Sequence, residues 1–305
     1  TALLLKAIFP AGNFVKIFPA DCADILQRIY HAIYSSRSDT AVFLQGFVIN
    51  FLAAGTLLFQ NNIEQNPSLS SREAAEKVVG KNFRRMISGS AFLSPALVDG
   101  FEEYGITVRQ GYGMSECSPR ISTSDFTDDE SKYSNGKVLS VHEVRVVDGE
   151  IQVKGPSVML GYYKRQKETE EAFTEDGFLH TGDLGYLKNG HIWLTGRKKN
   201  LIILSNGENV SPEELENLFV DDGIIKEVVV LGENDRFIAE IYPDLTFAEA
   251  NAITDIEGEI QKIVDRVNLA SPSDRQICSF RLREKPFERT STGKIKRSVF
   301  YYKGE

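Results

Sequence analysis

The sequence predicts an α/β protein in which a parallel-sheet layer and a small antiparallel β-barrel precede a small α+β C-terminal domain. Three observations support this prediction. Strand and helix patterns alternate over residues 86–109, hairpin signals recur over residues 144–193, and a new series of strands and helices begins after residue 197. Alternating strands and helices are typical of parallel sheets, and closely spaced hairpins are typical of antiparallel ones. We therefore expect two domains, residues 1–197 and 198–305, which suits a chain of 305 residues.

The first elements of the chain are expected to be helices. Residues 24–32 space their apolar side chains as an amphipathic helix does. Residues 41–59 carry no charge and are long enough to cross a bilayer. Gln45 and Asn50 interrupt this stretch and no basic cluster flanks it, so a buried core helix is favoured over a membrane span. An apolar surface in peripheral contact with a membrane is the third alternative.

The alternation of strands and helices begins with a capping box. Residues 70–73 place a serine and a glutamate three positions apart, which predicts a helix start, and Gly80 can end that helix. A short buried strand is expected to follow over residues 86–92.

A second helix is expected between that strand and the next one. Ser94 is a favourable N-cap, Pro95 suits the first helical position, and Gly105 can end the helix. Residues 106–109 then predict a strand that leads into a glycine-rich turn at residues 111–113.

The second half of the chain predicts hairpins and then a different domain. Asp148-Gly149 and Asn189-Gly190 lie between alternating apolar residues, which is typical of two-residue hairpin turns. Residues 211–214 (Ser-Pro-Glu-Glu) predict a capped helix in which Glu214 reaches back to the Ser211 amide. Strands are expected over residues 201–204, 228–231 and 237–242, and an amphipathic helix over residues 256–269.

Composition argues against several classes of function. The net charge of −8 argues against nucleic-acid binding, which uses a basic face. Three widely spaced cysteines give no disulfide framework and favour a reducing compartment, so we expect a cytoplasmic protein. The four histidines show no ligand-like spacing to the cysteines, so no zinc site is expected. The chain begins with Thr1 and shows no signal peptide, and we expect a fragment of a longer protein.

The segment Gly-Tyr-Gly-Met-Ser-Glu at residues 111–116 has the chemistry of a nucleotide site. Gly113 allows the backbone to approach a flat base closely, and Tyr112 offers an aromatic face for stacking. Ser115 can donate a hydrogen bond to a phosphate oxygen, and Glu116 is a hard oxygen ligand suited to Mg²⁺. The alternative is a glycine-rich turn with a solvated glutamate.

Three further polar residues suit the same chemistry. Asp183 follows Thr-Gly in an expected loop, and its carboxylate can accept hydrogen bonds from both hydroxyls of a ribose. A surface-turn aspartate is the alternative. Arg197 offers a planar fork of donors to ribose or phosphate, or forms a structural ion pair. Lys294 lies in a glycine-flanked basic loop, where a mobile tail is the simpler interpretation.

Four segments, in their order along the chain, resemble the adenylate-forming superfamily of acyl-CoA synthetases, peptide-synthetase adenylation domains and luciferases. They are residues 111–116, His-Thr-Gly-Asp-Leu at 180–184, Gly-Arg-Lys-Lys at 196–199 and Thr-Ser-Thr-Gly-Lys-Ile at 290–295. Residues 158–163 and 197–216 make the chain most similar to long-chain fatty acyl-CoA ligases. The resemblance implies that a fatty carboxylate is activated by ATP and Mg²⁺ to an acyl-adenylate and transferred to coenzyme A.

The resemblance also assigns roles to the residues of the nucleotide site. It implies that Tyr112 stacks on adenine, that Ser115 meets the α-phosphate and that Glu116 holds the metal. Asp183 would bind the ribose hydroxyls, with Arg197 at the ribose or phosphate.

The same resemblance implies a small domain that moves. Lys294 would bridge the carboxylate and the α-phosphate during adenylation. Rotation at residues 198–199 would then withdraw it, and the loop that contains Gly207 would line the path of the pantetheine thiol.

Two departures from the family pattern affect these expectations. The family has a Ser/Thr/Gly-rich phosphate loop ending in Pro-Lys-Gly, and residues 1–110 contain nothing of that kind. Phe92 changes the strand end against which adenine would lie. The chain is therefore expected to be the C-terminal part of such an enzyme and inactive by itself. The alternatives are a ligase that loads the phosphopantetheine of a carrier protein, and a non-catalytic fragment that binds a nucleotide or a partner.

Overall fold

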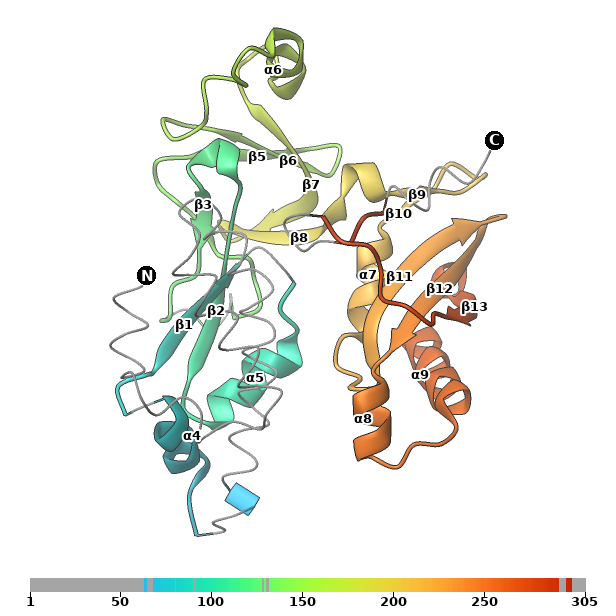
Figure 1. Ribbon diagram of the computed structural model, residues 1–305. Helices are drawn as coiled ribbons and strands as arrows, with labels where there is room; N and C mark the ends of the chain where they lie inside the picture. The colour runs from blue at the N-terminus through green and yellow to red at the C-terminus, as the bar shows by residue number, and fades with distance from the viewer. Residues whose placement is uncertain are drawn as a thin grey trace. The chain divides into compact units, whose positions relative to one another are not determined.

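The computed structural model describes residues 63–64, 68–79, 81–89, 92–127, 129, 132–290 and 295–297 (Figure 1). The helices expected at residues 24–32 and 41–59 lie outside this part of the chain, as do Gly80 and Lys294. The chain divides into two compact units, Thr1–Val108 with Arg289–Lys294 and Arg109–Glu288 with Ile295–Glu305. The domain boundary after residue 197 stays a prediction.

The first unit follows the strand and helix alternation that the sequence predicts. It contains α4 (Ser71–Val79), β1 (Arg85–Gly89) and α5 (Pro95–Glu103), and β2 (Thr107–Gly113) begins in it. The capping box before α4 is confirmed, because the Ser70 amide donates to Glu73 Oε2 at 2.9 Å. The Ser94 cap is also confirmed, since its Oγ accepts from the Leu97 amide at 3.2 Å. The apolar cluster of this unit consists of Ala75, Leu93, Val98, Phe101, Tyr104, Ile106 and Val108.

Eight strands form one large sheet in the order β1-β2-β3-β4-β8-β7-β6-β5. The strands not yet bounded are β3 (Arg120–Thr123), β4 (Lys137–Val138), β5 (Glu143–Val147), β6 (Glu150–Lys154), β7 (Leu179–Lys188) and β8 (His191–Arg197). The short helices η2 (Ser115–Cys117) and α6 (Gln166–Ala172) connect some of them. In the order of the sheet, every pair of neighbouring strands from β2 through β3, β4, β8, β7 and β6 to β5 is antiparallel. The antiparallel pairing expected for this region is confirmed, and its strands belong to one hydrogen-bonded sheet with β1.

Both predicted hairpin turns are confirmed. Asp148 and Gly149 have φ values of 49° and 77° between β5 and β6, and Asn189 and Gly190 have 53° and 76° between β7 and β8. Two successive positive φ values define the turn that matches the twist of paired strands, and Asp, Asn and Gly adopt them most readily. The turn expected at residues 111–113 is wrong, because these residues end strand β2.

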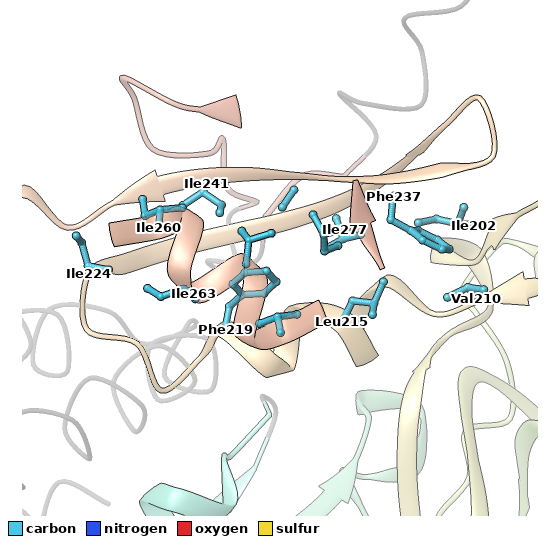
Figure 2. Packing of buried hydrophobic residues seen from close by; sticks show 14 of the residues in the cluster. Ile202, Val210, Leu215, Phe219, Ile224, Phe237, Ile241, Ile260, Ile263 and Ile277 are labelled. Atoms are coloured by element: carbon cyan, nitrogen blue, oxygen red, sulfur yellow. The ribbon is translucent and has the colours of Figure 1, made fainter. Parts of the chain in front are cut away.

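The C-terminal part of the second unit is a small α+β arrangement. Its strands are β9 (Ile202–Ile203), β10 (Asn209–Val210), β11 (Ile225–Glu233), β12 (Arg236–Pro243) and β13 (Ile277–Leu282). Its helices are η3 (Lys198–Asn200), α7 (Pro212–Glu216), η4 (Asn217–Phe219), α8 (Leu245–Ala250), α9 (Ile256–Ala270) and η5 (Ser273–Arg275). β12 pairs antiparallel with β11 and parallel with β13. Figure 2 shows Phe219, Phe237 and Ile260 in the apolar core between this sheet and its helices.

The capping box expected at the start of α7 is wrong. Ser211 lies at the N-cap, but its Oγ donates to the Thr195 carbonyl and to Glu213 Oε2, each at 2.9 Å. The carboxylate of Glu214 instead accepts from Arg275 at 3.1 Å. A charged guanidinium is a stronger partner for this carboxylate than a backbone amide.

Among the described helices, none combines the length and the apolar character that crossing a membrane requires.

Candidate functional site

Asp183 lies in a β-bulge of strand β7 rather than in the expected loop between strands. The register of β6 and β7 shifts between Glu150 and Gln152, and Gly182 adopts a φ of 68° at this point. Such a conformation favours glycine because a side chain would clash with the backbone. Thr181 Oγ1 donates to the Ile151 carbonyl at 2.7 Å and fixes the bulge to β6. A bulge re-aims the side chain that follows it.

The Asp183 carboxylate is buried and brings together three of the predicted site residues. Its Oδ2 accepts a hydrogen bond from Tyr112 Oη at 2.7 Å. Its Oδ1 lies 2.8 Å from Nε of Arg197, whose side chain is 42% exposed whereas that of Asp183 is 6% exposed. The residues come from β2, β7 and β8, and Asp183 and Arg197 stand opposite each other in the β7–β8 register. An anionic group with a cationic fork at the surface suits a ligand that carries both hydroxyls and phosphate.

Tyr112 belongs to the core of the sheet as well as to this site. Its ring packs in the cluster that contains Ile121, Ile151 and Ile192, and the residue is 8% exposed. Burial raises the pKa of Tyr112 far above its usual range, and the charge of Asp183 raises it further. The tyrosine therefore remains a neutral hydrogen-bond donor. Its role in stacking on adenine stays a prediction.

Ser115 and Glu116 lie together in η2, immediately after β2. Ser115 is exposed, and Glu116 Oε1 accepts from Tyr162 Oη at 3.0 Å. The Met159 amide donates to the Glu116 carbonyl at 2.7 Å, which holds this turn against the segment after β6. Burial, and next the contact with Glu116, raises the pKa of Tyr162, so Tyr162 also acts as a donor.

A Mg²⁺ ion at Glu116 would depend on ligands that the nucleotide supplies. Within the described part of the chain, no group of three or more His, Cys, Asp or Glu side chains is placed to hold a metal ion. The hydrogen bond from Tyr162 engages one carboxylate oxygen of Glu116. A single carboxylate with phosphate oxygens and water is the usual way in which Mg²⁺ is held at a nucleotide, so Glu116 fits that arrangement.

Gly113 and Gly207, the two glycines predicted for the site, occupy positions that favour glycine for different structural reasons. A Cβ on Gly113 would lie 1.8 Å from the Pro119 carbonyl oxygen, so the close approach here is to the protein's own backbone. Gly207 has a φ of 83° in the turn between β9 and β10, where its amide donates to the Leu204 carbonyl at 2.8 Å. A Cβ built on Gly207 meets nothing within 4 Å. Open space beside this turn is compatible with the predicted thiol path, which stays a prediction.

Lys294 itself lies outside the described residues, but the segment that follows it is held in place. The Lys296 amide donates to the Glu288 carbonyl at 2.8 Å. The Arg297 guanidinium pairs with Glu216 on α7, and Glu216 Oε1 also accepts from the Val230 amide at 2.7 Å. Burial raises the pKa of Glu216 to about 7, although Arg297 acts in the opposite direction.

One buried residue beside the site was not expected from the sequence. Glu150 is 3% exposed at the start of β6, and its carboxylate contacts Gly182, which precedes Asp183, and Lys198, which follows Arg197. A glutamate directly after a hairpin turn gives no sign of burial, because such positions are commonly solvated.

Two family models and several known proteins match this chain. A model described as AMP-binding enzyme matches residues 35–163, and one described as AMP-binding enzyme C-terminal domain matches residues 199–303. The long-chain-fatty-acid–CoA ligase FadD15 of Mycobacterium bovis is 34% identical over 246 residues, which cover 72% of this chain and 40% of that protein. The long-chain-fatty-acid–CoA ligase 6 of Rattus norvegicus is 31% identical over 261 residues, which cover 79% and 36%. The chain thus spans 40% or less of the length of these relatives.

Solved structures show the same fold. O-succinylbenzoate coenzyme A synthetase from Bacillus subtilis, in complex with ATP and magnesium ion, is 28% identical with a TM-score of 0.59, and the match covers 70% of this chain and 46% of that one. The adenylation domain of a carboxylate reductase from Mycobacterium chelonae has a TM-score of 0.63 at 24% identity, covering 82% and 43%.

Proposed function

Because this chain belongs to the AMP-binding enzymes of the adenylate-forming superfamily, we propose that it is part of an acyl ligase that uses ATP and coenzyme A. The enzyme would activate a fatty carboxylate to an acyl-adenylate and transfer the acyl group to the thiol. The names of the long-chain-fatty-acid–CoA ligases among its relatives support the choice of substrate.

The observation that carries this proposal is the convergence of Tyr112, Asp183 and Arg197. The three residues lie on three different strands, and Tyr112 and Asp183 are 71 positions apart in the sequence. Tyr112 and Arg197 nevertheless both contact the buried Asp183 carboxylate. A carboxylate offers about four acceptor positions in two directions. Ribose hydroxyls would share the Asp183 carboxylate with Tyr112, or replace its hydroxyl, and Arg197 would meet the ribose or phosphate at the exposed edge. The ATP complex of the Bacillus subtilis synthetase supports a nucleotide as the ligand.

The remaining predicted residues would act on the phosphates and the reacting groups. Ser115 is exposed and can donate to the α-phosphate, and Glu116 would hold Mg²⁺ together with phosphate oxygens. When bound, Mg²⁺ supplies positive charge that stabilises the transferring phosphate. Lys294 would bring its ammonium to the carboxylate and α-phosphate, and the Gly207 turn would border the thiol. Movement of residues 198–305 between these two steps is part of the proposal.

Residues 1–110 contain no phosphate loop of the family type, so we expect this chain by itself to make no acyl-adenylate. The decisive experiment uses the natural polypeptide in which this sequence occurs, with palmitate, ATP, Mg²⁺ and coenzyme A. Palmitate-dependent exchange of labelled pyrophosphate into ATP, followed by formation of palmitoyl-CoA, is the expected result. Absence of both reactions would leave a non-catalytic binding protein as the better interpretation.

Two controls separate the steps and the acceptors. Lys294→Ala should abolish pyrophosphate exchange and leave thioester formation from supplied palmitoyl-adenylate largely intact. Equal loss of both half-reactions would contradict the movement of the C-terminal domain. Replacing coenzyme A by a phosphopantetheinylated carrier protein tests the alternative acceptor, and acylation of the carrier alone would overturn coenzyme A as the thiol.

A further inference from the structure

A buried carboxylate that the proposed chemistry does not use contacts the sequence neighbours of Asp183 and Arg197. Glu150 is the first residue of β6 and is 3% exposed. Its Oε1 accepts from the Gly182 amide at 3.0 Å, and its Oε2 lies 3.2 Å from Nζ of Lys198 and 3.0 Å from Nδ1 of His180. A buried carboxylate is costly unless several donors satisfy it, and here three donors do so.

The positions of two of these donors are informative. Gly182 directly precedes Asp183, and its amide lies in the bulge that aims the Asp183 side chain. Lys198 directly follows Arg197, and it begins η3, which starts where β8 ends. The Glu150 side chain therefore contacts both the backbone next to Asp183 and the residue next to Arg197.

We propose that Glu150 is a positioning residue for the nucleotide site, because its carboxylate fixes Gly182 and Lys198 and thereby sets the relative placement of Asp183 and Arg197. This inference rests on the ribose-binding role proposed for Asp183. Glu150 would not touch the nucleotide; it would act through its two neighbours on β7 and at the end of β8.

The charge of Glu150 is consistent with this role. Burial alone raises the pKa of its carboxyl, but His180, Lys198 and the Gly182 amide outweigh burial and leave the pKa below its usual value. The carboxylate is thus ionised at neutral pH, so the Lys198 ammonium and the Gly182 amide both donate to a charged acceptor. Such hydrogen bonds are stronger and more directional than neutral ones.

Glu150→Gln and Lys198→Gln remove, one at a time, the two charged groups of the Glu150–Lys198 ion pair. Glutamine keeps the size of Glu150 and an acceptor oxygen for Gly182, but it removes the charge that Lys198 needs. The Lys198 side chain is 59% exposed, so its replacement should leave the fold intact even if the buried Glu150 variant is unstable. Glu143→Gln serves as the matched control, since Glu143 is an exposed glutamate on the neighbouring strand β5.

The readout is discrimination between AMP and 2′,3′-dideoxy-AMP, measured by calorimetry on the natural polypeptide that contains this sequence. The wild-type protein should bind AMP at least about 10-fold more tightly than 2′,3′-dideoxy-AMP, because a hydrogen bond to a charged group contributes on the order of one decade in affinity. Glu150→Gln should lower this ratio by about 10-fold and Lys198→Gln by about 3-fold, with affinity for the dideoxy nucleotide changed less than 2-fold. Glu143→Gln should leave the ratio unchanged.

The outcomes separate this inference from the proposal beneath it. A wild-type protein that binds both nucleotides equally would overturn the ribose role of Asp183, and the positioning role with it. A wild-type protein that discriminates, together with Glu150→Gln and Lys198→Gln variants that keep the full ratio, would overturn the positioning role alone. Equal weakening of both nucleotides in these variants would indicate a purely structural carboxylate and would also overturn the inference.

Discussion

The hydrogen bond between Tyr112 and Asp183 allows a direct test of the site's energetics. Tyr112→Phe removes the hydroxyl that donates to Asp183 Oδ2 at 2.7 Å, and Asp183→Ala removes the acceptor. Both residues are buried, at 8% and 4% exposed, so each single substitution removes a hydrogen-bond partner that bulk water does not readily replace. The double variant Tyr112→Phe with Asp183→Ala completes a double-mutant cycle.

Two contacts of the Asp183 carboxylate determine the stability that its removal should cost. A hydrogen bond to a charged group contributes about 1.5–3 kcal/mol to the free energy of unfolding. The Arg197 side chain is 42% exposed, so its pairing with Asp183 should add at most about 1 kcal/mol after solvent screening. We therefore expect Asp183→Ala to cost about 1.5–4 kcal/mol and the coupling free energy between Tyr112 and Asp183 to be about 1.5–3 kcal/mol.

Urea unfolding of this chain can measure the cycle through its single tryptophan. Trp193 lies on β8, and its ring stacks on Tyr186 of β7 with a centroid distance of 6.0 Å. Its fluorescence therefore reports on the same pair of strands that carries Asp183 and Arg197. A coupling free energy below about 0.5 kcal/mol would show that the Tyr112–Asp183 hydrogen bond contributes little to stability.

Three further changes have defined outcomes. Because the pKa of Glu216 rises from 4.5 to about 7, the folded state holds its proton where the unfolded state has lost it. Stability should therefore fall as pH rises through 7, by up to about 3 kcal/mol, and Glu216→Gln should remove this slope in urea titrations between pH 5 and about 8. Gly196→Ala should destabilise by about 1–3 kcal/mol, because the new Cβ would lie 1.8 Å from Ser211 Oγ, and an unchanged midpoint would show that Ser211 yields freely. Gly100→Ala in α5 meets nothing within 4 Å and should instead stabilise by about 0.5–1 kcal/mol, so a loss of stability would contradict its helical, open environment.

Features that depend on neighbouring residues in the sequence could be predicted from it. The hairpin turns at Asp148-Gly149 and Asn189-Gly190 need only two residues that tolerate positive φ. The Ser94 cap and the capping box at residues 70–73 need partners three residues away, and they form as expected. The motifs also allowed candidate site residues to be named, and the structure brings Tyr112, Asp183 and Arg197 together; their roles stay predictions.

Features that depend on distant partners could not be predicted. Glu214 pairs with Arg275, 61 residues away, so the local capping box at Ser211 does not form. Asp183 was expected in a loop between strands, whereas it is buried in strand β7. The bulge that buries it arises only when β7 pairs with β6, and the Glu150 contacts arise from the same pairing.

Binding of the ribose of an adenine nucleotide is the role that we propose for Asp183. It is tested by calorimetric titration of AMP into the wild-type natural polypeptide and into its Asp183→Asn variant. Asparagine keeps the size of the side chain but loses the charge to which the ribose hydroxyls would donate. We predict that Asp183→Asn weakens AMP binding by at least about 10-fold while binding of 2′,3′-dideoxy-AMP changes little. Equal AMP affinity in the two proteins would mean that the Asp183 carboxylate does not bind the ribose.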